Sequence, residues 1–403
     1  MKTRLLIVGI SLLFGQIVYG QDNEEDADWV YKISPKDYFF NIPYSDVNGK
    51  LIINAVINDK NFRFIFDTGA EISLIRKSVA EELNLPVIGW NVAEDGTGKK
   101  DTVNTVSIPS LKIGDITFTT VAAPTLEENI IMDCFEVDGI IGFNLFVSSA
   151  LRISSVDKTI TITNNPEKLN HKEENSSQLF YCGGMPCILA RFINQEKNIH
   201  SDNHITLDIG SNGFLSVPSS EYKERYKDTE LFDFIEEYEG VMDLGLYGEF
   251  GEKNMRYHVK IHELSVNQMT FSDIDIHTGD EQMYSFGSEL LDYGIIIIDN
   301  VNGKFNFEPV GESNISLKPK EKSIEVTINE DKMIIISDVM DENLKSKINT
   351  GDRVLRIDGV DYQSVSTCDI LKGFLMRGKK SAVFEIEDLS TKEIKKIEIQ
   401  LNK

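Results

Sequence analysis

Positive charge is scarce in this chain, which has 41 lysines and arginines against 65 aspartates and glutamates among its 403 residues. The formal net charge is −24, and it would be −26 without residues 1–20, which contain Lys2 and Arg4 and no acidic residue. Phosphate backbones and anionic lipids repel such a chain, so we expect no nucleic-acid partner and no attachment to an anionic membrane surface. By itself, the acidic balance predicts a well-solvated surface.

Long apolar runs are also scarce. Beyond the N-terminus none is long enough to cross a membrane, and residues 294–298 have only the length of a buried strand. The N-terminus combines Lys2 and Arg4 with an apolar stretch at 5–18 and Val-Tyr-Gly at 18–20, the pattern of a secretory signal peptide over residues 1–20. We therefore expect an exported protein, periplasmic or secreted, without a membrane span.

Only four cysteines are present. Cys182 and Cys187 flank Gly-Gly-Met-Pro, a turn-forming insert, and in an exported protein we expect them to form a disulfide. Cys134 and Cys368 fall in different predicted domains, so we expect both to be unpaired.

Histidines number six, and their spacing does not suggest a metal site. His258 and His262 have a helical metal spacing, but they fall on a predicted strand, where four residues span about 13 Å, too far for one ion. His200 and His204 read as surface residues. No Ser-His-Asp or Cys-His set is supported, and we expect neither a metal nor an organic cofactor.

A short acidic motif occurs twice. Residues 64–70 read Phe-Ile-Phe-Asp-Thr-Gly-Ala, and residues 205–211 read Ile-Thr-Leu-Asp-Ile-Gly-Ser. In each copy an apolar strand runs into an aspartate and then a glycine that permits a tight turn. Two carboxylates presented by similar turns can share one proton and perform acid–base hydrolysis.

The two motifs belong to a longer internal repeat. Leu111 and Leu264 occupy matching places in two predicted hairpins, 153 residues apart, and Asp67 and Asp208 lie 141 residues apart. Residues 140–142 and 285–287 form a second matching pair of elements, each ending in glycine. A short helix is predicted at residues 78–83 and a longer one at residues 220–239. The repeat predicts two β-rich lobes, at residues 37–165 and 180–310.

The D-T-G-A motif after apolar residues, its second copy and the repeated lobes resemble the pepsin and retropepsin aspartic peptidases. The resemblance implies a mainly β, bilobal fold with one aspartate from each lobe at a central cleft, and water-mediated hydrolysis of a peptide or protein substrate. It implies Asp67 and Asp208 as the catalytic pair. The residues it implies as site support are Thr68, Gly69, Ala70, Gly210 and Ser211.

One residue departs from the pattern of this family. The family carries Thr or Ser where this chain has Ile209, so a reciprocal hydrogen bond with Thr68 cannot form through a second hydroxyl. A hairpin flap is expected with its tip at Gly96, Thr97 and Gly98, and residues 245–251 are its second-lobe counterpart. The loss of the hydroxyl keeps open an alternative, a catalytically weak or inactive peptide-binding protein of the same fold.

Residues 318–402 change character. The stretch from Lys347 to Val360 resembles the central strand and turn of a PDZ domain, with alternating apolar residues before Asp358 and Gly359. The resemblance implies an α+β domain that can hold a peptide C-terminus. The corresponding ligand loop at residues 329–332 has no glycine and two acidic residues, so a substrate-presenting or packing role is an equal alternative.

Overall fold

The computed structural model describes residues 31–96, 98–127, 129–169, 175–241, 246–247, 253–317, 323–328, 333–361, 368–369, 372 and 379–401. The predicted signal peptide at residues 1–20 lies outside these residues. Within them, no helix combines the length and the apolar character that a membrane crossing requires.

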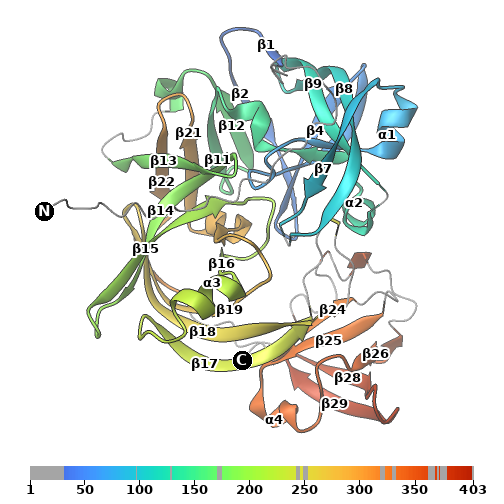
Figure 1. Cartoon of the computed structure of the whole chain (residues 1–403), viewed down its shortest axis with the longest axis vertical. Coiled ribbons are helices and arrows are strands. Elements are labelled where there is room, and N and C mark those ends of the chain that lie inside the picture. The colour runs from blue at the N-terminus through green and yellow to red at the C-terminus, as the bar shows by residue number, and fades with distance from the viewer. Residues whose placement is uncertain are drawn as a thin grey trace, which may run out of the picture.

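The first lobe is built around one mixed sheet, at the upper right in Figure 1. Among the described residues its nine strands are β1 (Lys32–Ser34), β3 (Ser45–Val47), β4 (Lys50–Ile57), β5 (Lys60–Phe66), β6 (Leu74–Arg76), β7 (Val87–Glu94), β8 (Lys100–Ile113), β9 (Ile116–Leu126) and β10 (Gly139–Ile141). Two short helices flank it, α1 (Lys77–Glu82) and α2 (Ile130–Phe135). The helix expected at residues 78–83 is therefore present as α1.

A larger sheet carries the second lobe and joins it to the first. Its strands are β2 (Phe39–Pro43), β11 (Ala150–Ser154), β12 (Thr159–Thr163), β13 (Ser177–Cys182), β14 (Met185–Asn194), β15 (Ile199–Leu207), β16 (Leu215–Ser216), β17 (Phe232–Val241), β18 (Lys253–Val266), β19 (Met269–His277), β20 (Ser285–Phe286), β21 (Gly294–Asp299), β22 (Lys304–Pro309) and β23 (Asn314–Ser316). The closing hairpins of the two lobes, β11–β12 and β21–β22, pair with each other through Leu151 opposite Ile298. Strands from both halves of the repeat thus form one continuous sheet between the lobes.

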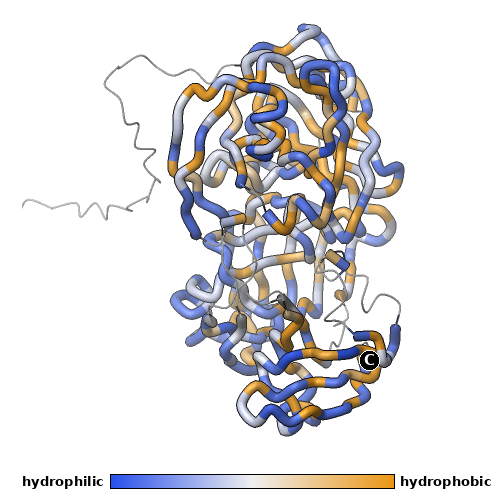
Figure 2. The backbone as a smooth tube through the Cα atoms, turned by 90° about the vertical axis from the view of Figure 1, so that its right-hand side faces the viewer, coloured by the Kyte–Doolittle hydropathy of each residue, from blue (hydrophilic) through white to orange (hydrophobic). Residues whose placement is uncertain are grey.

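The repeat predicted from sequence is visible in the pairings. In the first lobe β10 runs parallel to β5, and in the second β20 runs parallel to β15. The predicted hairpin turns at Gly114-Asp115 and Asn267-Gln268 join β8 to β9 and β18 to β19. Apolar and polar residues alternate along many of these strands, as the hydropathy colouring in Figure 2 shows. One buried apolar cluster extends through both lobes, so they fold around a common core.

The prediction of a long helix over residues 220–239 is wrong. The helix α3 spans only Ser219–Arg225, and β17 follows from Phe232 to Val241. The segment pairs antiparallel with β18 over its whole length, and Phe232 is buried against the aromatic side chains of Tyr222 and Tyr226. Cross-strand pairing and aromatic packing outweigh the local helical preference of this acidic stretch.

The C-terminal region has its own sheet and its own buried cluster. Its described strands are β24 (Ile324–Ile328), β25 (Ile334–Val339), β26 (Arg353–Ile357), β27 (Val360–Asp361), β28 (Ser381–Glu387) and β29 (Ile394–Gln400), and the short helix α4 (Glu342–Lys345) accompanies them. The apolar cluster of this sheet is separate from that of the lobes. The predicted strand and turn at Asp358-Gly359 are present as the β26–β27 hairpin. The predicted ligand loop at residues 329–332 lies outside the described residues.

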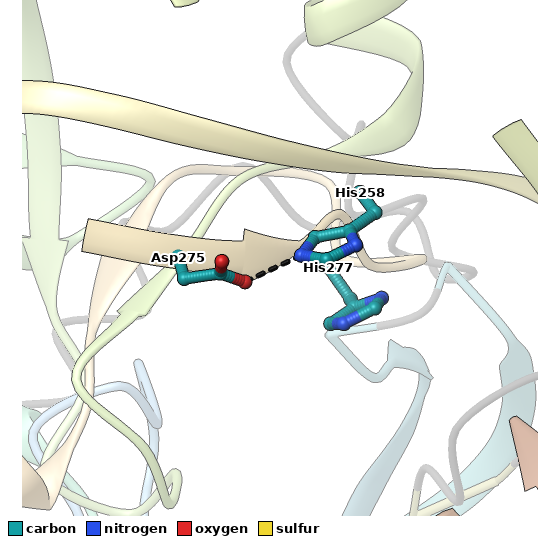
Figure 3. A group of neighbouring side chains, drawn as sticks. All are labelled: His258, Asp275 and His277. Atoms are coloured by element: carbon teal, nitrogen blue, oxygen red, sulfur yellow. Dashed lines mark hydrogen bonds and ion pairs between the residues drawn. The ribbon is translucent and has the colours of Figure 1, made fainter. Parts of the chain in front are cut away.

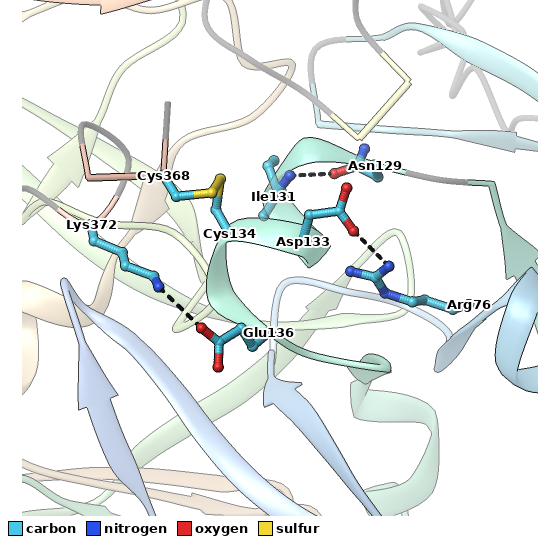
Figure 4. Close-up of a disulfide and its surroundings, with 8 residues drawn as sticks. All are labelled: Arg76, Asn129, Ile131, Asp133, Cys134, Glu136, Cys368 and Lys372. Atoms are coloured by element: carbon cyan, nitrogen blue, oxygen red, sulfur yellow. Dashed lines mark hydrogen bonds and ion pairs between the residues drawn. A yellow bond between two sulfur atoms is a disulfide. The ribbon is translucent and has the colours of Figure 1, made fainter. Parts of the chain in front are cut away.

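The four cysteines form two disulfides, Cys182–Cys187 and Cys134–Cys368. The first was expected, and the prediction that Cys134 and Cys368 are unpaired is wrong. Cys134 lies on α2 of the first lobe, and the C-terminal region brings Cys368 to a Cα–Cα distance of 4.6 Å (Figure 4). An ion pair between Lys372 and Glu136, at 3.7 Å, lies beside the disulfide. The two cysteines belong to regions with separate apolar cores, but they meet because the C-terminal region packs against the first lobe.

Candidate active site

Each repeated motif places its aspartate in the same backbone setting. In the first lobe the amide of Asp67 donates to the carbonyl of Ile141 at 3.0 Å. In the second lobe the amide of Asp208 donates to the carbonyl of Phe286 at 2.9 Å. Each aspartate thus leaves its strand at the point where the parallel neighbour ends, as the repeat predicts.

The two carboxyl groups meet between the lobes. The glycine of each motif packs against the carboxyl group of the opposite lobe, and each carboxyl group is also held by its own loop. The amide of Gly69 donates to Oδ1 of Asp67 at 2.8 Å, and the amide of Ser211 donates to Oδ1 of Asp208 at 3.0 Å. Burial and the neighbouring Asp67 raise the pKa of Asp208 to about 8. The pair therefore favours a form with one retained proton.

The glycines of the two motifs lie against the aspartates of the opposite lobes. A Cβ atom on Gly69 would lie 2.3 Å from the carboxyl carbon of Asp208. A Cβ atom on Gly210 would lie 2.0 Å from the carboxyl carbon of Asp67. Real Cβ contacts are never so short, so any larger residue would push the carboxyl groups apart. Glycine is required at both positions by this close approach between the lobes.

Thr68 links the two loops. Its side chain is fully buried, and its Oγ1 donates to the carbonyl of Leu207 and accepts from the amide of Ile209 at 3.1 Å. The side chain of Ile209 is fully buried in the common apolar cluster and returns no hydrogen bond. The cross-lobe link is therefore present in one direction only, from a first-lobe hydroxyl to second-lobe backbone.

Ala70 and Ser211 support the site through their backbones. The carbonyl of Ala70 accepts from the amide of Phe143 at 2.8 Å, and the carbonyl of Ser211 accepts from the amide of Ser288 at 2.9 Å. These matched bonds tie each aspartate loop to the chain that follows its parallel neighbour.

A lysine that the sequence analysis missed lies at the same place. Lys50 begins β4, and its Nζ donates to the carbonyl of Gly210 in the opposite lobe. The preceding Gly49 has φ of +80°, and a Cβ atom there would lie 2.7 Å from Oγ of Ser288. A tight first-lobe turn packed on the second lobe therefore positions this side chain. The Asn48-Gly49 pair signals a hairpin turn in the sequence, but no local signal indicates what the next residue faces.

Lys50 acts electrostatically on both aspartates. Burial lowers the pKa of Lys50, while the negative charges of Asp208 and Asp67 favour its protonated form. In turn, the positive charge of Lys50 opposes the rise in the pKa of Asp208. The site is therefore two carboxyl groups with one ammonium group beside them, an arrangement that the resemblance to aspartic peptidases did not imply.

The hairpin predicted as a flap reaches the second lobe. It consists of β7 and β8, and the carboxylate of Asp95 at its tip accepts from the amide of Tyr247 at 2.8 Å. The carbonyl of Gly96 accepts from the amide of Gln282 at 3.2 Å. Gly98 has φ of +84° and lies against the side chain of Gln282, whereas Thr97 lies outside the described residues. Of the second-lobe counterpart at 245–251, only residues 246 and 247 are described.

A known protein family matches most of the first lobe, including Asp67. Residues 53–145 match the family model for aspartyl proteases. No curated protein matches the chain.

Two of the solved structures that match the chain are aspartic proteases. A retropepsin-like aspartic protease from Rickettsia conorii shares 18% identity, covers 33% of this chain and 95% of its own, and has a TM-score of 0.24. An aspartic proteinase from Irpex lacteus shares 11% identity, covers 68% of this chain and 97% of its own, and has a TM-score of 0.41.

Proposed function

We propose that this chain is an exported aspartic endopeptidase that hydrolyses peptide bonds with a water molecule activated by Asp67 and Asp208. The observation that carries this proposal is the meeting of two repeated aspartate loops, in which the glycine of each loop packs against the carboxyl group of the other. The close packing of Gly69 and Gly210 against those groups fixes their separation. The match of residues 53–145 to aspartyl proteases supports the same chemistry.

The proposed reaction begins from the pair with one retained proton. The ionised carboxylate takes a proton from water as the water oxygen attacks the peptide carbonyl carbon. The protonated carboxyl group gives its proton to the carbonyl oxygen. When the tetrahedral intermediate collapses, the carboxyl group that took the water proton gives it to the amine nitrogen as the C–N bond breaks. The other carboxylate takes a hydroxyl proton of the intermediate as the carboxylic acid product forms, so the pair again holds one proton. No metal and no covalent intermediate takes part in this route.

Lys50 has a defined place in this proposal. Its ammonium group lies beside the carboxyl pair and bonds the carbonyl of Gly210, a backbone acceptor next to Asp208. Its positive charge stabilises the ionised carboxylate, which the reaction needs as a base. Lys50 therefore helps to set the pH range over which the pair holds one proton.

Export and the PDZ-like assignment belong to the same proposal. The N-terminal pattern at residues 1–20 and the two disulfides support a periplasmic or secreted location. A separate sheet, six-stranded in the part of the chain that the structure describes, and the short helix α4 support a PDZ-like domain, which would bind a peptide C-terminus or present substrate. Sequencing of the mature N-terminus in the native host tests the proposed export, with cleavage after Gly20 as the expected result.

A second candidate function is peptide binding without efficient hydrolysis. The fully buried Ile209, which leaves the cross-lobe link one-sided, favours it. An ammonium group bound at the carbonyl of Gly210 also occupies a backbone acceptor beside the aspartates.

Hydrolysis of a peptide library by residues 21–403 tests the two functions. Asp67→Asn and Asp208→Asn should each reduce cleavage to background, because each removes one member of the acid–base pair. Asp202→Asn is the matched control, since Asp202 lies on β15 before Asp208 and pairs with Arg191 at the surface. Cleavage that survives either active-site change would contradict a shared pair. A folded protein that binds pepstatin or peptides and cleaves none would establish the second function instead.

A further inference from the structure

A histidine-rich cluster lies away from the aspartates, where the second lobe meets the C-terminal sheet. One ligand atom from each of His258, Asp275 and His277 lies within 4.8 Å of the other two (Figure 3). All three side chains are partly buried. The cluster is on β18 and β19, and the neighbouring strand β17 contacts β25 of the C-terminal sheet.

Strand pairing explains why these residues meet. His258 and His277 are direct partners across the antiparallel pair of β18 and β19. Asp275 lies two residues before His277 on β19, so it projects from the same face. The spacing of His258 and His262 along one strand does not reveal His277, which is closer to His258 but lies on the next strand.

The outer ring nitrogens of both histidines face oxygen atoms of neighbouring side chains. Nδ1 of His277 is 2.7 Å from the hydroxyl of Tyr238, and Nδ1 of His258 is 3.8 Å from Oε1 of Glu236. In each ring this leaves Nε2 as the nitrogen for a ligand, and Nε2 of His258 is 2.5 Å from Oδ1 of Asp275. Such outer partners orient histidine ligands in protein metal sites.

We propose that His258, Asp275 and His277 bind one divalent transition-metal ion of the zinc type. Two imidazoles and a carboxylate are a common zinc ligand set, with water completing the coordination. Zinc–ligand bonds of about 2.0–2.1 Å require ligand atoms to lie about 3.3 Å apart. Binding would draw the most distant of the three ligand atoms inward and lengthen the 2.5 Å contact between His258 and Asp275. It would also rotate one imidazole out of the stack that His258 and His277 form, in which the ring centroids are 4.2 Å apart.

The ion would also affect the junction with the C-terminal sheet. Glu236, next to His258, forms an ion pair with Lys345 on α4 of the C-terminal region. Glu325 on β24 acts electrostatically on His277. A bound divalent cation would offset the negative charge gathered here and hold β18 and β19 together beside the contact with the C-terminal region. This inference is independent of the peptidase proposal.

Isothermal titration of the untagged, chelator-treated residues 21–403 with Zn²⁺ tests the site. The expected result is one ion per chain, with binding at least tenfold weaker in His277→Ala and in Asp275→Asn. The second variant keeps the size of the side chain, so it separates ligation from misfolding. The matched control is His262→Ala, because His262 lies on the same strand and pairs with Asp233 at 3.0 Å, outside the cluster.

Thermal melting provides a second readout. Zn²⁺ should raise the melting temperature of the unmodified chain and of His262→Ala more than that of Asp275→Asn, because an ion stabilises the folded state in proportion to how tightly it binds there. The proposal is overturned if the unmodified chain binds no Zn²⁺. It is also overturned if both cluster variants bind as tightly as the unmodified chain, or if His262→Ala loses as much affinity as they do.

Discussion

The two aspartate loops differ most in the residue that follows the aspartate. In the first lobe this residue is Thr68, whose hydroxyl both donates to and accepts from the second-lobe backbone. In the second lobe it is Ile209, whose side chain is fully buried in the common core. A single hydrogen bond contributes about 0.5–1.5 kcal/mol net, whereas full burial of such a side chain contributes about 1.5–3 kcal/mol.

The two lobes therefore place their aspartates in equivalent positions but hold the two aspartate loops by different interactions. The second loop is anchored by apolar burial and offers only backbone groups to its partner, while the first supplies the hydroxyl. The carboxyl groups still meet, because the glycines and the parallel strands place them. Substitutions in one lobe at a time can test how each aspartate loop is held.

The largest effect is expected from the glycines. Gly69→Ala and Gly210→Ala would each place a Cβ atom within 2.3 Å of the opposite carboxyl carbon, so both should lower kcat/KM by about 100-fold or more. Steady-state peptide hydrolysis measures this. Gly89→Ala is the control, because a Cβ atom there meets no atom within 4 Å. Retention of most activity in Gly210→Ala would mean that the lobes do not approach this closely.

The two disulfides should differ in their effect on stability. Cys134 and Cys368 are 234 residues apart in sequence, and Cys182 and Cys187 are 5 apart. Loop-closure entropy then gives the longer link an advantage of about 3 kcal/mol in the free energy of unfolding. Urea denaturation of the two double serine variants measures the difference. Equal losses would show that the C-terminal region remains docked without its covalent link.

Thr68→Val removes the cross-lobe hydroxyl while keeping the shape of the side chain. It should lower the free energy of unfolding by about 1–3 kcal/mol, because the buried amide of Ile209 loses its acceptor. Ile209→Thr should change it by no more than about 1 kcal/mol, since a hydrogen bond returned to the first-lobe backbone offsets lost apolar burial. Thermal or urea unfolding measures both. A larger loss from Ile209→Thr would show that burial dominates in the second loop.

The stability gained from Asp208→Asn should depend on pH. The pKa of Asp208 is raised from its ordinary value of 3.8 to about 8, so the folded state holds a proton that the unfolded state has lost between these pH values. Stability therefore falls as pH rises through this range, and asparagine removes that loss. We expect the variant to be more stable by about 1–4 kcal/mol at pH 7, with a smaller margin at pH 5. A margin that does not change with pH would contradict the assignment.

The smallest expected effect comes from Lys50. Lys50→Met removes a positive charge that opposes the rise in the pKa of Asp208, so the alkaline limit of peptide hydrolysis should move to higher pH. The pH profile of kcat/KM measures this. Lys112→Met, on the exposed surface of β8, should leave the profile unchanged. An alkaline limit that stays in place would separate Lys50 from the proton of the pair.

Much of the fold could be predicted because its signals are local and repeated. An apolar strand before each aspartate, a following glycine and matched hairpins predict two equivalent lobes, and the strand pairings agree. The prediction of helix over residues 232–239 is wrong because the acidic residues of this segment suit a helix locally. Its pairing with β18 is a long-range contact that no local pattern reports.

By itself, the sequence determined which residues carry the carboxyl groups, where the chain turns, and that the motif is duplicated. Only the tertiary structure decided that Lys50 lies beside the two aspartates, that Cys134 pairs with Cys368, and that His258 meets His277. The physical reason is the range of the interactions. Turns and strand patterns depend on neighbouring residues, whereas a charge near a carboxylate, a disulfide or a cross-strand pair depends on how distant segments pack.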